Sequence, residues 1–534
     1  MKYIKSWIFT LVLISSFQFG QAQSYGVEIS PISIEGLGGL QSYAVGTYNG
    51  EWLLIGGRLD GLHRRQPFAA FSADGKNQEL IVVNPADKKV WRAQIASLPT
   101  ALREQLSSTN MQFYQSENRL LCTGGYGYSP TSDDHITFPY LTVVNISQTI
   151  SDVKNNTVNV SSFHQIENEA FRVTGGALNK IEDVYHLVGG HRFMGRYNPM
   201  GPDHGPGFEQ EYSDEIRRFK INIDEEITVE FLSPFHDAMH LHRRDYNLVP
   251  YLSGNERALM VYSGVFQNTA DLPWLYPVSI NKNGYQPKED FTQYFNHYHC
   301  ANLPIFDQES GDMHTLFFGG IAQFYKENDV LVQDNDVPFV NTIAEISRST
   351  SGELKETRLM TKMPGYLGAG SVFIFNTDAQ MIDDDILDGS MIGHEYQDVG
   401  YIYGGIRSSL PNIFWINTGQ ESEASQTIYK VAIKRVEDVS SASEMDDKAY
   451  LQFYPNPASQ LVRMSIDIEK QADLSITITN AMGAHVYKQV IQKSDLIQGR
   501  NHIVLDEVNI GYGAFHYTVN IGDKVITRKV IWTE

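Results

Sequence analysis

Arginine and histidine residues gather beside a short phrase that this chain repeats, an apolar run ending in a glycine pair. The guanidinium group binds carboxylates and sulfates through paired, charge-assisted hydrogen bonds. We predict that these residues share one face and form an anion-binding pocket, although structural ion pairs with nearby acids such as Asp60 and Glu211 are the competing interpretation. The residues of this prediction are Arg58, His63, Arg64, Arg65, Arg172, His191, Arg192, His242, Arg243, Arg244, His299 and Arg407.

Three hypotheses of function follow from this set. The first is a binding module for an acidic glycan or a protein partner, and the second is an adhesin that uses the rim of the fold. The third is a lyase or epimerase of an acidic sugar, in which arginine neutralises the carboxylate and a side chain moves the α proton. The candidate proton carriers are His242, His299, Tyr246 and Tyr298. We favour the binding module because no two residues identify themselves as acid and base.

Two histidine pairs raise the question of a metal. His240 and His242, and likewise His297 and His299, have the spacing that places two imidazoles on one face of a strand. No carboxylate or cysteine motif completes such a site. We therefore predict neither a metal nor another cofactor.

The repeated phrase predicts the fold. Its glycine pairs begin at residues 56, 124, 189, 263, 319 and 404, the fourth being a Ser-Gly copy. Such recurrence marks a repeat architecture, and four strands per unit predict an all-β, six-bladed β-propeller. We expect the third strands at 80–84, 141–145, 216–222, 278–281, 341–347 and 413–417, and the fourth at 90–97, 160–166, 227–232, 291–295, 354–359 and 428–436.

A resemblance supports this architecture. The run from Trp52 to Gly57, the strand at 80–84 and the aromatic Val90-Trp91 resemble a kelch repeat. The kelch family forms four-stranded propeller blades, and the resemblance covers residues 25–437. It implies architecture only, because kelch propellers include enzymes, carbohydrate binders and scaffolds.

The end of the chain has a different composition. Residues 438–448 are rich in Ser, Glu and Asp and predict a linker, and alternating strands follow. Residues 449–534 resemble the type A C-terminal sorting domain of the Bacteroidetes type IX secretion system, with a basic end that includes Lys529. The resemblance implies a small β-sandwich, contact with the secretion machinery, and a protein that is released or attached to the cell surface. The opening motif is Tyr454, Pro455, Asn456 and Pro457.

The beginning of the chain predicts export. Lys2 and Lys5 precede an apolar core, and the small residues before Ala22 suit cleavage after that residue, so 1–22 reads as a signal peptide and 23–437 as the propeller. The formal net charge of -21 argues against nucleic acid as a partner. No later apolar stretch is long enough to span a membrane, and we expect a monomer. Cys122 and Cys300 are expected to be buried, unpaired residues.

Overall fold

The computed structural model describes residues 24–198, 201, 205, 207–223, 226–327 and 330–436. Near the C-terminus it describes 451–454, 458, 462–468, 472–480, 484–496, 499–505, 511–522 and 524–533. The chain divides into two compact units, Met1–Asp438 and Val439–Glu534. The all-β prediction is confirmed: the described α-helices are two short ones, α1 (Thr100–Leu106) and α2 (Ile146–Lys154). The expected signal peptide and linker lie outside the described residues.

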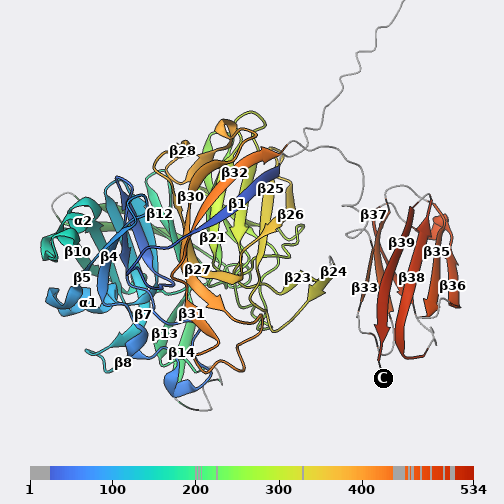
Figure 1. Ribbon diagram of the computed structural model, residues 1–534, viewed down its shortest axis with the longest axis horizontal. Coiled ribbons are helices and arrows are strands. Elements are labelled where there is room, and N and C mark those ends of the chain that lie inside the picture. The colour runs from blue at the N-terminus through green and yellow to red at the C-terminus, as the bar shows by residue number, and fades with distance from the viewer. Residues whose placement is uncertain are drawn as a thin grey trace, which may run out of the picture. The chain divides into compact units, whose positions relative to one another are not determined.

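Runs of four antiparallel strands make up the first unit (Figure 1). The first three are β2 (Ala44–Tyr48), β3 (Glu51–Ile55), β4 (Glu79–Asn84) and β5 (Lys89–Gln94); β6 (Thr109–Ser116), β7 (Arg119–Ser129), β9 (Tyr140–Asn145) and β10 (Phe163–Glu167); and β11 (Ala177–Ile181), β12 (Val184–Val188), β15 (Glu215–Asn222) and β16 (Thr228–His236).

Three more runs follow along the chain. They are β17 (Asn247–Ser253), β18 (Glu256–Tyr262), β19 (Val278–Asn281) and β20 (Gly284–Pro287); β21 (Ala301–Phe306), β22 (Met313–Phe318), β25 (Thr342–Arg348) and β26 (Leu354–Lys362); and β27 (Tyr366–Phe375), β30 (Gln397–Ser408), β32 (Ile428–Val436) and β1 (Ser24–Ile32). Five of the six expected third strands are confirmed.

The last run joins the two ends of this unit. Strand β1 pairs antiparallel with β32 along its whole length, from Ser24 opposite Val436 to Ile32 opposite Ile428. Residues 428–436 were predicted to be a fourth strand. They form the third strand of this run. The expected third strand at 413–417 was wrong, because buried Ile413 belongs to a loop that packs against the preceding sheet.

The expected fourth strand at 291–295 was also wrong. This segment makes no ladder with its neighbours; the amides of Tyr294 and Phe295 donate instead to the carboxylate of Glu356, at 2.6 and 3.0 Å. The true fourth strand of that run, β20, comes earlier. A carboxylate can therefore accept the backbone hydrogen bonds of a segment whose sequence predicts a strand.

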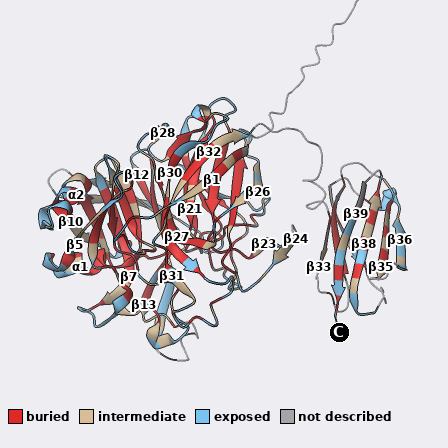
Figure 2. Ribbon diagram, in the orientation of Figure 1, coloured by how far each residue is buried: buried red, intermediate tan, exposed pale blue. Residues whose placement is uncertain are grey.

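Buried apolar strands of neighbouring sheets form the core, as the red segments in Figure 2 show. The first strands of successive sheets, β2, β6, β11, β17, β21 and β27, lie beside one another. At the glycine pairs, backbone from the next sheet comes very close. A Cβ added to Gly124 (φ 62°) would lie 1.9 Å from the carbonyl oxygen of Val173, so only glycine fits there.

The second unit contains two small sheets. One consists of β33 (Leu451–Tyr454), β34 (Val462–Ile468) and β37 (Gly499–Leu505), and the other of β35 (Leu474–Asn480), β36 (His485–Ile491), β38 (Gly513–Ile521) and β39 (Lys524–Trp532). Their apolar faces share one core that includes Ile476 and Tyr517. Tyr454 ends β33 and Lys529 lies on β39, whereas Pro455, Asn456 and Pro457 fall outside the described residues.

Candidate functional site

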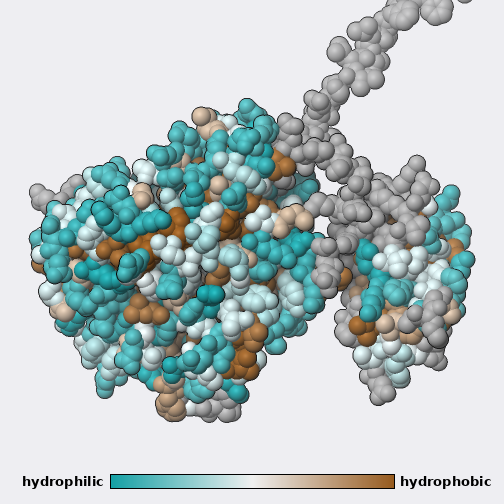
Figure 3. Space-filling model, in the orientation of Figure 1, coloured by the Kyte–Doolittle hydropathy of each residue, from teal (hydrophilic) through white to brown (hydrophobic). Residues whose placement is uncertain are grey.

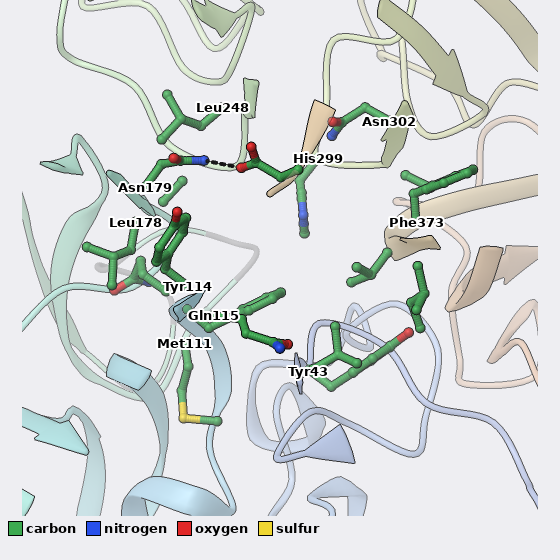
Figure 4. A pocket seen from close by; sticks show the side chains of 18 of the residues that line it. Tyr43, Met111, Tyr114, Gln115, Leu178, Asn179, Leu248, His299, Asn302 and Phe373 are labelled. Atoms are coloured by element: carbon green, nitrogen blue, oxygen red, sulfur yellow. Dashed lines mark hydrogen bonds between the residues drawn. The ribbon is translucent and has the colours of Figure 1, made fainter. Parts of the chain in front are cut away.

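A cavity of about 470 Å³ lies between the six first strands, each of which contributes to its wall. Figure 4 shows side chains from several sheets around this space, among them Tyr43, Met111, Gln115 and Phe373. The wall is mixed, with amides, hydroxyls and aromatic rings. We call the end of the cavity nearest the glycine pairs the glycine end.

A series of backbone hydrogen bonds surrounds the glycine end. It connects residues near the start of the first strands, and we call these residues the mouth ring. The bonds run from Ser42 N to Gly370 O (2.9 Å), Gly370 N to His299 O (2.9 Å), His299 N to Asp245 O (2.8 Å), Asp245 N to Gly175 O (2.7 Å), and Asn110 N to Ser42 O (3.1 Å). Asp245 and His299 are the two mouth-ring residues with titratable side chains, and they are neighbours.

Arg244 lies beside the mouth ring with its side chain only 15% exposed. Its Nη1 donates to the Asp245 carboxylate and its Nε donates to the Tyr212 hydroxyl at 3.2 Å. The guanidinium carbon lies 5.0 Å from the centre of the Phe266 ring. Within the described part of the chain, Nη2 makes no hydrogen bond, and it is not sealed from solvent.

The local backbone fixes this arrangement. Arg244 exchanges backbone hydrogen bonds of 2.8 and 2.9 Å with Val265. Asp245 adopts a left-handed φ of 52°, which is a strained conformation for a residue with a side chain. Gly175 makes room for the carboxylate, since a Cβ there would lie 3.0 Å from Asp245 Oδ1. Ser42 and Asn110 of the mouth ring adopt the same conformation, each with a φ of 53°, so it is a feature of the ring.

Aromatic rings from other loops surround the arginine. Tyr212 stacks on the His242 imidazole with 3.7 Å between ring centres, and His242 Nδ1 hydrogen-bonds to Asp214 at 2.7 Å. The Tyr197 ring lies 4.7 Å from that of His63. Aromatic walls around a cation are typical of sites that bind sugars or other ring-shaped ligands.

Burial controls the charges of the site. Burial lowers the pKa of Arg244, but Asp245 together with the surrounding tyrosines outweighs it and holds that pKa above its usual range. Burial, followed by the negative charge of Asp245, raises the pKa of Tyr298 well above 10. The phenol therefore stays protonated and is a hydrogen-bond donor.

Burial favours the neutral form of three imidazoles of the site. Burial lowers the pKa of His63 to about 4, and it holds that of His191 well below its usual value, helped by the positive charge of Arg244. Burial also lowers the pKa of His299. The His299 ring reaches into the cavity (Figure 4) and makes no hydrogen bond to any residue that the structure describes. A neutral, unbonded imidazole can accept a proton or a hydrogen bond from a ligand.

The opposite end of the cavity, the hairpin end, is built differently. The hairpin of β28 (Met381–Asp383) and β29 (Ile386–Asp388) adds to the inner edge of β21 through a parallel pairing. It lies at the other end of the unit from β13, β14 and β31 in Figure 1. Arg257 ion-pairs with Asp383 and Asp385 at 2.6 and 2.7 Å, and Asn179 donates to Asp385 at 3.3 Å. The tip of the hairpin is thereby tied to two other sheets.

The predicted site residues fall into three groups. Those gathered around the mouth ring are His63, His191, His242, Arg244 and His299. Those paired with acids elsewhere are Arg58 with Asp60, Arg172 with Glu169, Arg192 with Glu209 and Glu211, and Arg407 with Glu423. Arg64 and Arg65 are exposed and have no ion pair with a described residue.

Arg243 is the clearest departure from the predicted cluster. It is 1% exposed and lies between the rings of Trp274 and Tyr276. Its nitrogens donate to the backbone carbonyls of His240, Ser263 and Tyr276 at 2.7–2.9 Å. This arginine supports the backbone of its own sheet.

Aromatic residues are the part of the site that the basic pattern missed. Tyr212 and Phe266 hold Arg244, and Tyr197 comes from the long insertion after the third glycine pair. The predicted binding set contained only arginine and histidine, and the tyrosines considered as proton carriers were Tyr246 and Tyr298. A search for tyrosine and phenylalanine in the same loops would have found them.

The two histidine pairs do not form a metal site in the described residues, where no group of three potential ligands occurs. His240 bonds to Asp237 and Glu289, at 2.7 and 2.9 Å. His297 bonds to the Gln293 carbonyl at 2.9 Å. Each imidazole is thus engaged separately. Cys122 and Cys300 are buried and unpaired, as expected.

Comparisons with known proteins identify the second unit. Residues 452–533 match the secretion system C-terminal sorting domain, which confirms that prediction and indicates type IX secretion to the cell surface or medium. No curated protein matches the chain. A solved structure titled "Structure of YjhT" is similar, at 10% identity and a TM-score of 0.40, over 76% of this chain and 97% of that one. No helix in the described residues has the length and apolarity of a membrane span.

Proposed function

We propose that the first unit is a closed, six-bladed, kelch-type propeller that binds an acidic glycan at the glycine end of its central cavity. The type IX sorting domain indicates that the chain is exported, so its ligand is met outside the cell. A signal peptide at 1–22, a sorting domain over 449–534 and a monomeric state remain parts of this proposal.

The unused nitrogen of Arg244 is the observation that carries the proposal. Asp245 and Tyr212 fix the guanidinium beside the mouth ring, and Nη2 has no hydrogen bond to a described residue. A fixed arginine in a partly dry site binds a carboxylate or sulfate strongly because little conformational entropy is lost. The tyrosine, phenylalanine and neutral histidine side chains around it suit the face and hydroxyl groups of a sugar ring.

The closed ring is supported by the pairing of β1 with β32 and by the hydrogen bonds of the mouth ring. Deleting residues 24–32 removes the outer strand of the last sheet. We expect that variant to lose cooperative unfolding. A cooperative transition of unchanged midpoint would contradict closure by the first strand.

Titration of the mature full-length protein with a uronic acid, followed by calorimetry, tests the ligand. We expect Arg244→Lys to weaken binding about tenfold, because lysine keeps the charge beside Asp245 but has no second nitrogen to bind the ligand while the first binds Asp245. Arg192→Lys is the matched control, an exposed arginine with exposed partners. Equal binding of uronic acid and its neutral parent sugar would contradict an acidic glycan and leave a protein ligand as the working alternative.

An enzyme acting on an acidic sugar is the second candidate, and the unbonded ring of His299 favours it. With a carboxylate on Arg244, His299 could accept the α proton, while Tyr298 could donate to the resulting enediolate. Incubation of uronic acids with wild type and His299→Asn tests this idea, with exchange of the α hydrogen in deuterated water as the readout. Exchange catalysed equally by both proteins would exclude His299 as the base.

A further inference from the structure

We propose that Trp415, flanked by Arg64 and Arg65, forms a second subsite that holds the next sugars of an acidic polysaccharide whose end occupies the Arg244 site. This inference rests on the proposed function and names its ligand more closely, as a chain of several sugars. The subsite lies on the loop that includes residues 413–417, which had been predicted to be a strand.

The loop that carries Trp415 is fixed on both sides. The Asn417 side chain donates to the carbonyls of Leu62 and His63, each at 2.9 Å, and the Arg65 amide donates to the Asn417 carbonyl at 3.0 Å. Phe414 stacks on Phe339 with 5.8 Å between ring centres. A loop tied to two neighbouring sheets presents its side chains in one arrangement, so binding there costs little ordering.

Trp415 is nevertheless exposed. Its fractional exposure is 58%, and Ile416 beside it is 52% exposed. The visible surface of the unit is mostly hydrophilic with separate hydrophobic patches (Figure 3). Indole is costly to leave in water, and a rigid, exposed aromatic plane is a typical platform for the apolar face of a ligand ring.

Charge selects the kind of ring. Arg64 and Arg65 are both exposed, and neither has an ion-pair partner among the described residues, although the chain carries a net charge of -21. Gly419 packs against the Arg64 side chain, since a Cβ there would lie 2.5 Å from Arg64 Nε. Unpaired arginines next to an indole fit a sugar chain that carries carboxylate or sulfate groups.

The subsite is continuous with the Arg244 site through His63. The His63 carbonyl accepts a hydrogen bond from Asn417, and its imidazole packs against Tyr197. The positive charge of Arg244 contributes to the lowered pKa of that imidazole. Both sites thus contact one loop segment, 62–65. A ligand longer than one sugar can contact both.

Affinity as a function of chain length tests the inference, using a monomeric uronic acid and a linear tetrasaccharide of uronic acids with the mature full-length protein. We expect the tetrasaccharide to bind about tenfold more tightly than the monomer, and Trp415→Ala to abolish this gain without weakening the monomer. Tyr396→Ala, which removes another exposed aromatic, is the matched control. Quenching of tryptophan fluorescence by the tetrasaccharide alone would support the same conclusion.

A second variant guards against a folding defect in Trp415→Ala. Arg64→Gln combined with Arg65→Gln alters two exposed side chains and should lower tetrasaccharide affinity and its salt dependence. Unchanged tetrasaccharide affinity in both variants would overturn the second subsite while Arg244→Lys still tests the first. Failure of the wild type to bind either sugar would overturn the proposed function, and this subsite with it.

Discussion

The two ends of the central cavity each hold an arginine bound to aspartate, yet the two differ in what remains free. At the hairpin end, Arg257 binds Asp383 and Asp385, and also donates to Asn179 and to the Lys180 carbonyl at 2.9 and 2.8 Å. At the glycine end, Arg244 keeps Nη2 available. An arginine whose donors are all used fixes the fold, whereas one held by part of its donors can bind a ligand.

Burial separates two residues that are adjacent in sequence, because Arg243 is 1% exposed and the Arg244 side chain is 15% exposed. Arg243 donates to three backbone carbonyls, and Arg244 lies beside the mouth ring with its guanidinium on Asp245. Burial lowers the pKa of Arg243 to about 10, so it remains charged at neutral pH. Because neighbouring residues on an extended backbone point in opposite directions, one enters the core and the other the site.

The largest expected effect is on stability, from Arg243→Met. The substitution removes the donor of three carbonyls, of which that of Ser263 is fully buried, and we expect a loss on the order of 3 kcal/mol in the free energy of unfolding. Urea denaturation of the mature protein measures this loss. Arg218→Met is the matched control, since Arg218 also donates to carbonyls but at the surface, and it should cost less than about 1 kcal/mol. Equal losses in the two variants would show that burial does not distinguish them.

Arg257→Met should have an intermediate effect, confined to stability. Its partners Asp383 and Asp385 are about 30% exposed, which places the pair between surface and buried cases, so we expect a loss of about 1–2 kcal/mol. Affinity for a uronic acid should not change. A weakened affinity would show that the hairpin end belongs to the ligand site, and the contrast between the two ends would fail.

Acid should weaken the fold through its neutral imidazoles. Burial lowers the pKa of His63, His186 and His297 to about 4 each. The ordinary value is about 6.5, so the unfolded chain binds more protons between these limits. The stability that these groups contribute is complete above pH 6.5 and is lost as the pH falls toward 4.

The variant His297→Gln isolates one of these groups, because the amide can replace the hydrogen bond to Gln293. Its stability should fall less steeply between pH 6.5 and 4, by up to about 1.4 kcal/mol per pH unit. Urea denaturation at several pH values gives the two slopes. Parallel slopes for wild type and variant would mean that His297 is protonated in the folded protein.

Much of the fold was predictable because glycine pairs and strand alternation are local signals. Gly124 has to be glycine for steric reasons, and glycine recurs at the corresponding position of every repeat except the fourth, which has Ser263. The order of the last sheet was not predictable in the same way. Its outer strand comes from the other end of the unit, and the sequence of residues 24–32 does not indicate that they pair with β32.

The site was predictable only in outline. Residue types located Arg244, His63 and His299, because their loops all lead to the glycine end. Residue types could not distinguish Arg244 from Arg243, because the partners of each guanidinium are set by tertiary contacts. Trp415 was hidden because an apolar run that includes buried Ile413 looks like a strand until the loop is placed.

The smallest expected effect is that of Arg407→Ala, which tests whether basic charge at the glycine end matters in general. Arg407 is 62% exposed and pairs at 3.4 Å with Glu423, itself 66% exposed. Solvent and salt screen such a pair, so we expect less than about 0.5 kcal/mol in stability and no change in uronic acid affinity. Calorimetric titration with the uronic acid at low and at physiological salt measures the affinity, and urea denaturation measures the stability. A drop in affinity as large as that of Arg244→Lys would show that diffuse positive charge, and not one held guanidinium, binds the anion.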